Sequence, residues 1–220
     1  MQRTENGLQT YRRSQEIVAK YGDTPAFVQH HTIAIQPVLQ DPQRREKMIV
    51  YKAPSQAAMV QAYGRDAVEL IVRGYVMQLA DASGIGYTTE QVKMCASDIV
   101  SGWHYLTIYE IAAALKMARE GRFRDPKTGR NLATMYGSFS AVAISDCIAA
   151  FVREVRNPLI DRYEEEQRRA QLEQSMKHCV TKKWFVEKTF ITYLRFFNTF
   201  YLAISPFFST FASSNKKFNP

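Results

Sequence analysis

Cysteine is scarce in this sequence, and no two cysteines have the spacing of a metal site or of a redox motif. The chain contains three, Cys95, Cys147 and Cys179, an odd number at wide intervals. Such a set does not build the disulfide framework of a small secreted domain, so we expect a reducing compartment. The first fifteen residues also lack the apolar core of a secretory signal peptide. Both absences favour a cytoplasmic protein.

Side chains that carry out catalysis or hold metals are equally sparse. His30 and His31 are adjacent, and His104 and His178 stand alone, a spacing that does not suit a metal ion. His178 precedes Cys179, but consecutive residues on a helix do not face each other. The sequence also contains neither a phosphate-binding loop ending in Gly-Lys-Ser/Thr nor a complete Gly-x-Gly-x-x-Gly fingerprint. We therefore expect no metal, no other cofactor and no enzymatic activity.

The chain does contain enough apolar residues for a core, together with an excess of positive charge. Hydrophobic residues make up 46% of its 220 residues, which argues against wholesale disorder. The formal net charge is +8, a balance that favours acidic partners such as nucleic acid, anionic lipid or an acidic protein. A basic protein without a polyanionic partner is the alternative, because net charge governs solubility and encounter but not fold.

Helix start and stop signals dominate the middle of the chain. Thr88 is followed three residues later by Gln91, and Thr107 by Glu110. In this capping-box spacing, each pair satisfies two backbone N–H groups that have no partner at the start of a helix. Apolar periodicity extends these starts into helices and adds two more. The predicted helices span residues 55–80, 88–100, 108–119 and 139–156.

Three features of this pattern lead to more specific expectations. Gly64 either splits the first predicted helix or weakens it, and Ser138 is the expected N-cap of the last. Residues 23–54 hold half of the eight prolines, so we expect them to be irregular, with a short strand at residues 32–35. The fold class that follows is all-α: a small helical bundle with an irregular N-terminal arm and a C-terminal helical extension.

The expected organisation has four parts that differ in composition. A partly irregular N-terminal arm precedes the helical bundle core. Mostly charged residues then predict a solvated helix that leaves the bundle, and an aromatic-rich segment ends the chain. These parts span residues 1–54, 55–157, 158–183 and 184–220.

The composition changes abruptly where the aromatic-rich segment begins. Residues 184–211 hold eleven of the protein's 27 aromatic residues, and residues 196–214 form a run of nineteen without a charge. This length approaches that of a membrane span, and an aromatic helix at the membrane interface is a second interpretation. A helix packed on the bundle, or a tail without a defined role, is the alternative to both. The candidate membrane contacts are Trp184, Phe196, Phe197, Phe200, Tyr201, Phe207 and Phe208.

A basic loop follows the predicted helix over residues 108–119. Residues 116–130 contain six Lys or Arg and two acidic residues, a local net charge of +4. Residues 125–129 (DPKTG) favour a turn, because Pro presets φ and Gly accepts a left-handed conformation. A turn that displays cations can contact phosphates, and a nearby aromatic ring can stack on a base; a solvated connector is the alternative. The candidate nucleic-acid contacts are Arg119, Arg122, Arg124, Lys127, Arg130 and Tyr136.

Three segments between residues 87 and 157 form a recognisable series. A threonine-capped helix (TTEQVKMCASDIV) is followed by a helix with an acidic start (LTIYEIAAALKMAREGRF) and by an aromatic-glycine step before a third helix (MYGSFSAVAISDCIAAFVREVRN). In this series the chain resembles an uncharacterised family of small helical proteins encoded by phages and mobile elements of gut bacteria. The insert at residues 125–130 is longer than in that series, and the aromatic tail has no counterpart. Such families often sit among replication genes, so the resemblance implies a replication-associated role and no particular site residues.

Two hypotheses of function follow. The first is a non-enzymatic replication or nucleic-acid-binding accessory protein of a phage or mobile element, which docks through the basic loop on DNA, RNA or a replisome protein. The alternative is a membrane-associated structural or interaction protein that uses residues 184–220 as its anchor. In that case the otherwise cytoplasmic protein would be held at a membrane by its C-terminal segment.

Overall fold

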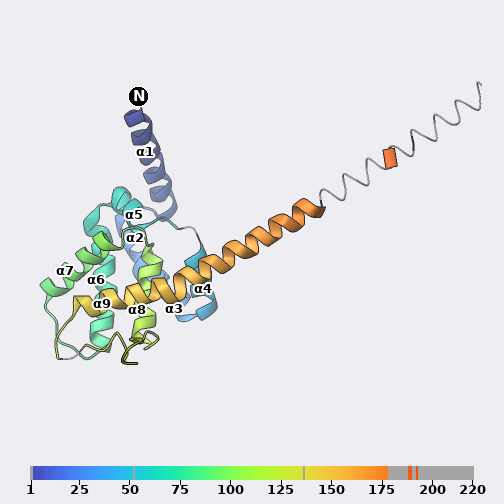
Figure 1. Cartoon of the computed structure of the whole chain (residues 1–220). Coiled ribbons are helices and arrows are strands. Elements are labelled where there is room, and N and C mark those ends of the chain that lie inside the picture. The colour runs from blue at the N-terminus through green and yellow to red at the C-terminus, as the bar shows by residue number, and fades with distance from the viewer. Residues whose placement is uncertain (1, 52, 136, 178–187, 190–191, 193–220) are drawn as a thin grey trace, which may run out of the picture. The chain divides into compact units, whose positions relative to one another are not determined.

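The structure, a computed structural model, describes residues 2–51, 53–135, 137–177, 188–189 and 192. Figure 1 draws these residues as a coloured ribbon. The chain divides into two compact units, Met1–Tyr163 and Glu164–Pro220. Every named element of the first unit is a helix, and the described residues contain no β-strand. The predicted all-α fold is therefore confirmed.

One long helix, α1, and several short ones fill the region before residue 55. These elements are α1 (Gln2–Tyr21), α2 (Thr24–Gln29), the π-helix η1 (His30–Ala34), α3 (Gln36–Gln40) and α4 (Pro42–Val50). The prediction that residues 23–54 are irregular is therefore wrong. The short strand expected at residues 32–35 is absent as well, because these residues belong to η1 and its C-cap.

The prolines of this region start helices instead of preventing them. Pro25, Pro37 and Pro42 each occupy the first turn of a helix. At that position the missing N–H would have no intrahelical partner, and the fixed φ already suits the helix. Asp23 and Asp41 precede two of these helices and accept hydrogen bonds from backbone N–H groups of the first turn. A proline-rich stretch thus becomes a series of short helices, two of which have an aspartate N-cap.

Further helices form the rest of the first unit. They are α5 (Gln56–Tyr63), α6 (Arg65–Ala82), α7 (Thr89–Gly102), α8 (Ile108–Arg119), α9 (Ala141–Phe151) and the π-helix η2 (Val152–Arg156). Gly64 separates α5 from α6 with a φ of +84°, and the capping boxes predicted at Thr88 and Thr107 are both present. Ser138 is not the cap of α9, because the chain still bends there. Ser140 is the cap, and its hydroxyl accepts from a backbone N–H of the first turn at 3.2 Å.

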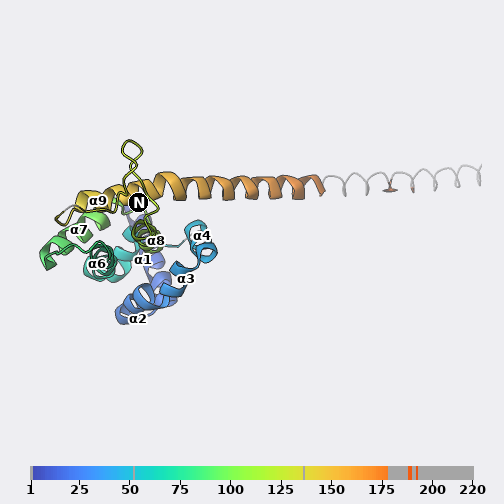
Figure 2. The same ribbon diagram turned by 90° about the horizontal axis from the view of Figure 1, so that it is seen from below.

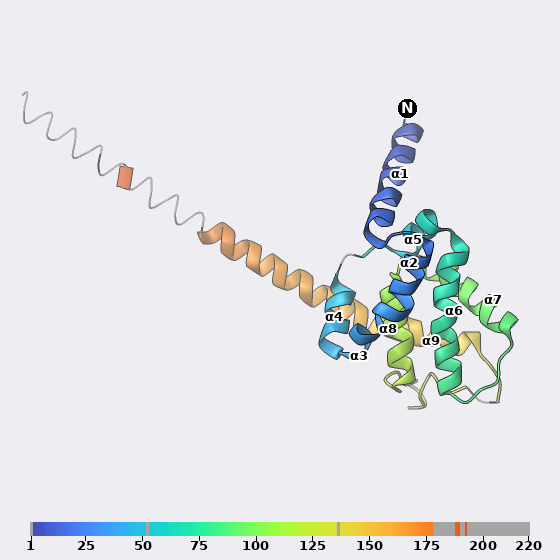
Figure 3. The same cartoon turned by 180° about the vertical axis from the view of Figure 1, so that it is seen from behind.

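Helix α8 lies at the centre of the first unit. The helices α3, α4, α6 and α9 all contact it, and Figures 2 and 3 show it among them. Ten of its twelve residues are buried, whereas its apolar pattern indicates only one narrow stripe. The core also includes Phe27, Ile35, Leu39 and Ile49, so the N-terminal region packs into the same core as the later helices.

The charged stretch that follows is helical as far as the structure describes it. Residues 157–163 and, in the second unit, residues 164–177 have helical backbone. Glu165 pairs with Arg168 at 3.3 Å and with Arg169 at 3.1 Å. All three side chains are largely exposed, so these pairs contribute little to stability.

Candidate nucleic-acid interface

The basic loop after α8 is a short hairpin. Leu132 donates its backbone N–H to the Phe123 carbonyl at 3.0 Å, and Asp125 donates its own to the Arg130 carbonyl at 2.8 Å. Between these bonds lies an antiparallel bridge that joins Arg124 to Asn131. The hairpin, residues 122–132, projects from the helices in Figure 2. Phe123 is fully buried and anchors its base in the core.

The tip of the hairpin is held together by the carboxylate of Asp125. One carboxylate oxygen accepts the backbone N–H of Lys127 at 2.9 Å, and the other accepts the hydroxyl of Thr128 at 2.7 Å. These donors hold the pKa of Asp125 below its usual value. Gly129 closes the turn by donating to the Asp125 carbonyl at 2.8 Å, and it does so with a φ of +69°. The sequence-based expectation of a turn at residues 125–129 is confirmed.

The cations of the hairpin lie at the surface. Arg122, Arg124, Lys127 and Arg130 are all exposed. Arg124 donates from Nη1 to the Gly129 carbonyl at 3.1 Å, which directs its guanidinium along the hairpin. Within the described part of the chain, the ion pairs include none formed by Arg122, Arg124 or Lys127. The one acid of the hairpin therefore binds its own turn and forms no ion pair with any of these three cations.

The base of the hairpin is electrically more balanced than the sequence count indicates. Glu120 accepts from Arg45 of α4 at 2.9 Å and pairs with Lys116 at 3.2 Å. Burial disfavours the charge on Glu120, but the hydrogen bonds from both cations outweigh burial and lower its pKa. Arg45 is buried, so this triad stabilises the contact between α4 and α8. Within residues 116–130, the exposed cations are therefore those of the hairpin.

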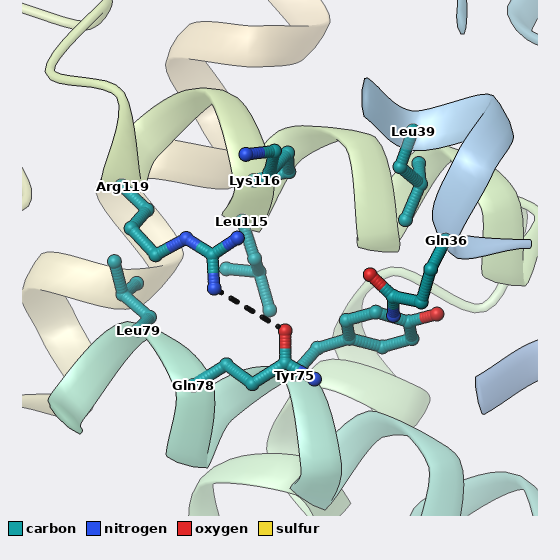
Figure 4. A pocket seen from close by; sticks show the side chains of 8 residues that line it. All are labelled: Gln36, Leu39, Tyr75, Gln78, Leu79, Leu115, Lys116 and Arg119. Atoms are coloured by element: carbon teal, nitrogen blue, oxygen red, sulfur yellow. Dashed lines mark hydrogen bonds between the residues drawn. The ribbon is translucent and has the colours of Figure 1, made fainter. Parts of the chain in front are cut away.

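Arg119 belongs to α8 and lines a cavity among α3, α6 and α8. Figure 4 shows its guanidinium directed toward Gln78, whose Oε1 accepts from Nη1 at 3.4 Å. Gln36 and Lys116 are further polar side chains at this cavity, which has a volume of about 10 Å³. That volume holds roughly one water molecule, so the cavity is no site for a nucleotide. The assignment of Arg119 as a phosphate contact stays a prediction.

The remaining predicted site residues lie outside the described part of the chain. Tyr136, expected to stack on a base, is one of them. The membrane contacts expected in the aromatic-rich segment are the others: Trp184, Phe196, Phe197, Phe200, Tyr201, Phe207 and Phe208. Among the helices that the structure does describe, none has both the length and the apolar character to cross a bilayer.

A cluster of buried aromatic and imidazole rings surrounds His31. The sequence pattern did not predict this cluster. The Nδ1–H of His31 donates to the Phe27 carbonyl at 3.0 Å, and its ring packs against Tyr21 and Tyr109 with centroids 5.1 Å away in each case. His31 Nε2 has no hydrogen-bond partner among the described residues. Burial lowers the pKa of His31 to about 4. The neighbouring His30 places its Nε2 2.7 Å from the Tyr109 hydroxyl.

Burial also limits what these groups and the thiols can do chemically. The imidazole of His31 is fully enclosed, so it is closed to a substrate and acts as a packed core residue. Cys95 and Cys147 are buried as well, and burial raises the pKa of each to about 12, which keeps them protonated. In the part of the chain that is described, His, Cys, Asp and Glu side chains form no group of three suited to a metal ion.

The hairpin is therefore the feature of the described chain that is best suited to contact a partner. Its shape is fixed by its own hydrogen bonds, and its outward side chains carry one sign of charge. Comparison of the chain with known proteins adds no relative to this description, since no family model, no curated protein and no solved structure matches it significantly.

Proposed function

We propose that this protein is a non-enzymatic nucleic-acid-binding accessory protein that docks through the hairpin at residues 122–132. Arg122, Arg124, Lys127 and Arg130 contact phosphates of the ligand. One observation carries the proposal: the hairpin displays four exposed cations, while its one carboxylate is bound by donors of the same turn.

Physical chemistry favours such a hairpin as a docking element. A cation on a preformed turn loses less conformational entropy on binding than a cation on an unstructured loop. Each phosphate that it neutralises releases condensed counterions, which drives binding at low salt. Backbone hydrogen bonds across the hairpin and the buried Phe123 supply the preformed frame.

The biological role in this proposal comes from the resemblance to proteins of phages and mobile elements. We assign the chain to DNA replication or a related process, in which it brings a replication component to nucleic acid. The proposed place of action is the cytoplasm, where the buried thiols of Cys95 and Cys147 stay reduced.

A charge-reversal experiment tests the proposal. The triple variant R122E/R124E/K127E should lose retention on a DNA column at low salt, because like charges then face the phosphates. The matched control is R12E/R13E/K93E, which changes the net charge equally at three exposed positions on α1 and α7. The control should be retained nearly as well as the parent. Equal retention of the parent and the hairpin variant would contradict the proposal.

A further inference from the structure

We infer that the ligand of this hairpin is the major groove of double-stranded B-form DNA, with Lys127 contacting base edges and the three arginines contacting the flanking phosphates. The inference rests on the proposed function and narrows it to one class of nucleic acid. It also assigns Lys127 a role that differs from that of Arg122, Arg124 and Arg130.

The width of the hairpin selects the groove. The bridge between Arg124 and Asn131 pairs the two arms of the hairpin, which at that point lie about 4.8 Å apart before any side chain is added. The minor groove of B-form DNA is roughly 6 Å wide and leaves no room for side chains on both edges. The major groove is about 12 Å wide and admits a two-stranded ribbon.

The length of the hairpin suits the depth of that groove. Phe123 is fixed in the core, and Lys127 at the tip follows four residues later. At about 3.3 Å per residue, the two residues from Phe123 to Asp125 span roughly 7 Å, and the turn at residues 125–129 places Lys127 beyond them. The major groove is about 8.5 Å deep. From the tip, the long side chain of Lys127 can therefore extend to the base edges, while side chains nearer the anchor stay at the level of the phosphates.

The hydrogen bonds of the tip leave Lys127 as the side chain suited to read bases. Both oxygens of Asp125 and the hydroxyl of Thr128 are engaged within the turn. The Lys127 ammonium is exposed and belongs to no ion pair of the described residues. A lysine in the major groove donates to O6 and N7 of guanine, so the tip should prefer guanine.

Other nucleic acids fit this hairpin less well. The major groove of A-form RNA is deep and too narrow for side chains to read. Proteins that bind single strands stack the bases on aromatic side chains. Within the described hairpin the aromatic residue is Phe123, and its ring is fully buried. These differences favour duplex DNA over duplex RNA and single strands.

The experiment compares three nucleic acids of one guanine-rich sequence by fluorescence anisotropy with the full chain. These are duplex DNA, duplex RNA and single-stranded DNA, each of about two helical turns in length. Duplex DNA should bind at least roughly tenfold more tightly than either of the others. Methyl green, which occupies the major groove, should displace the protein, and netropsin, which occupies the minor groove, should not.

Lys127 is tested with DNA in which 7-deazaguanine replaces guanine and so removes the N7 acceptor. The parent should bind this DNA roughly fivefold more weakly than ordinary DNA, and K127A should bind both equally. K93A, an exposed lysine of α7, is the control and should behave as the parent.

These results test the major-groove inference and the proposed function separately. Three results would overturn the major-groove inference and leave the proposed function standing. These are equal binding of RNA or single strands, displacement by netropsin alone, or an unchanged effect of 7-deazaguanine in K127A. Absence of binding to every one of these nucleic acids at low salt would overturn both.

Discussion

The buried imidazole of His31 ties the stability of the fold to pH. Its Nδ1–H donates to the Phe27 carbonyl, so a second proton would have to sit on Nε2, which has no acceptor among the described residues. Protonation is therefore disfavoured in the folded state, where the pKa is about 4. The pKa in the unfolded chain is about 6.5. Tyr21, Tyr109 and His30 face the same ring.

We expect the free energy of unfolding to fall as the pH is lowered from 7 to 4. Below about pH 6.5 the unfolded chain binds a proton at His31, whereas in the folded chain His31 stays neutral down to about pH 4. The stability present above pH 6.5 is therefore lost progressively as the pH falls to about 4. The loss from this one residue is roughly 3 kcal/mol. Urea denaturation gives the free energy of unfolding of the parent and of H31Q at pH 7 and at pH 4. The loss due to His31 is the change, between the two pH values, in the difference between the two proteins.

The control for this measurement is His30, which is less buried than its neighbour. Burial is the main cause that lowers the pKa of His30, with a smaller effect of Lys20. H30Q should change the pH dependence less than H31Q does. A difference between parent and H31Q that stays the same at both pH values would contradict the account of His31.

At the scale of single elements, Gly64 ends α5 and starts α6. Its φ of +84° and ψ of 158° place it in a region that side-chain-bearing residues rarely adopt. We predict that G64A lowers the free energy of unfolding by roughly 1–3 kcal/mol, measured by urea denaturation. The matched control is G74A inside α6, where an added Cβ meets no atom within 4 Å.

The control should change stability in the opposite direction. A Gly in the middle of a helix is less favourable than Ala, so G74A should stabilise the protein by roughly 0.5–1 kcal/mol. Equal effects of the two substitutions would show that backbone conformation does not limit the junction of α5 and α6.

Helix boundaries could be predicted from the sequence where the signal lies in a few neighbouring residues. The capping boxes at Thr88 and Thr107 involve only residues three positions apart, so the sequence alone located those helix starts. A proline fits both an irregular segment and a first helical turn, so Pro25, Pro37 and Pro42 were misinterpreted. The N-cap of α9 was assigned to Ser138 because the sequence has serines at both 138 and 140, and either could cap the helix. The backbone becomes helical only after Ser140, so Ser140 is the cap.

The candidate site was also only partly predictable. Its cations and the turn at residues 125–129 follow from composition and turn chemistry. The pairing of Arg45 with Glu120 joins residues 75 positions apart, and no local pattern connects them. The same holds for the burial of α8 on nearly all sides, which depends on where α3, α4, α6 and α9 pack.

At the scale of the whole molecule, the distribution of charge matters more than its sum. The net charge of +8 belongs to the full chain, but Arg45, Lys116, Arg65, Arg73 and Arg156 are paired with carboxylates in the first unit. The hairpin stands out because four of its eleven residues are exposed cations. A uniform attraction of the whole protein to polyanions would instead be weakened equally by charge reversal anywhere.

The salt dependence of DNA affinity tests this claim most directly. For the parent, a plot of the logarithm of the association constant against the logarithm of salt concentration should have a slope of about −3, as expected for phosphate contacts by Arg122, Arg124 and Arg130. R122E/R124E/K127E leaves only Arg130 of these contacts and should bring the slope to about −1 or nearer zero, and R12E/R13E/K93E should leave it near −3. Equal slopes for the two triple variants would contradict the account, because the hairpin would then contribute no more than any other cationic surface of this protein.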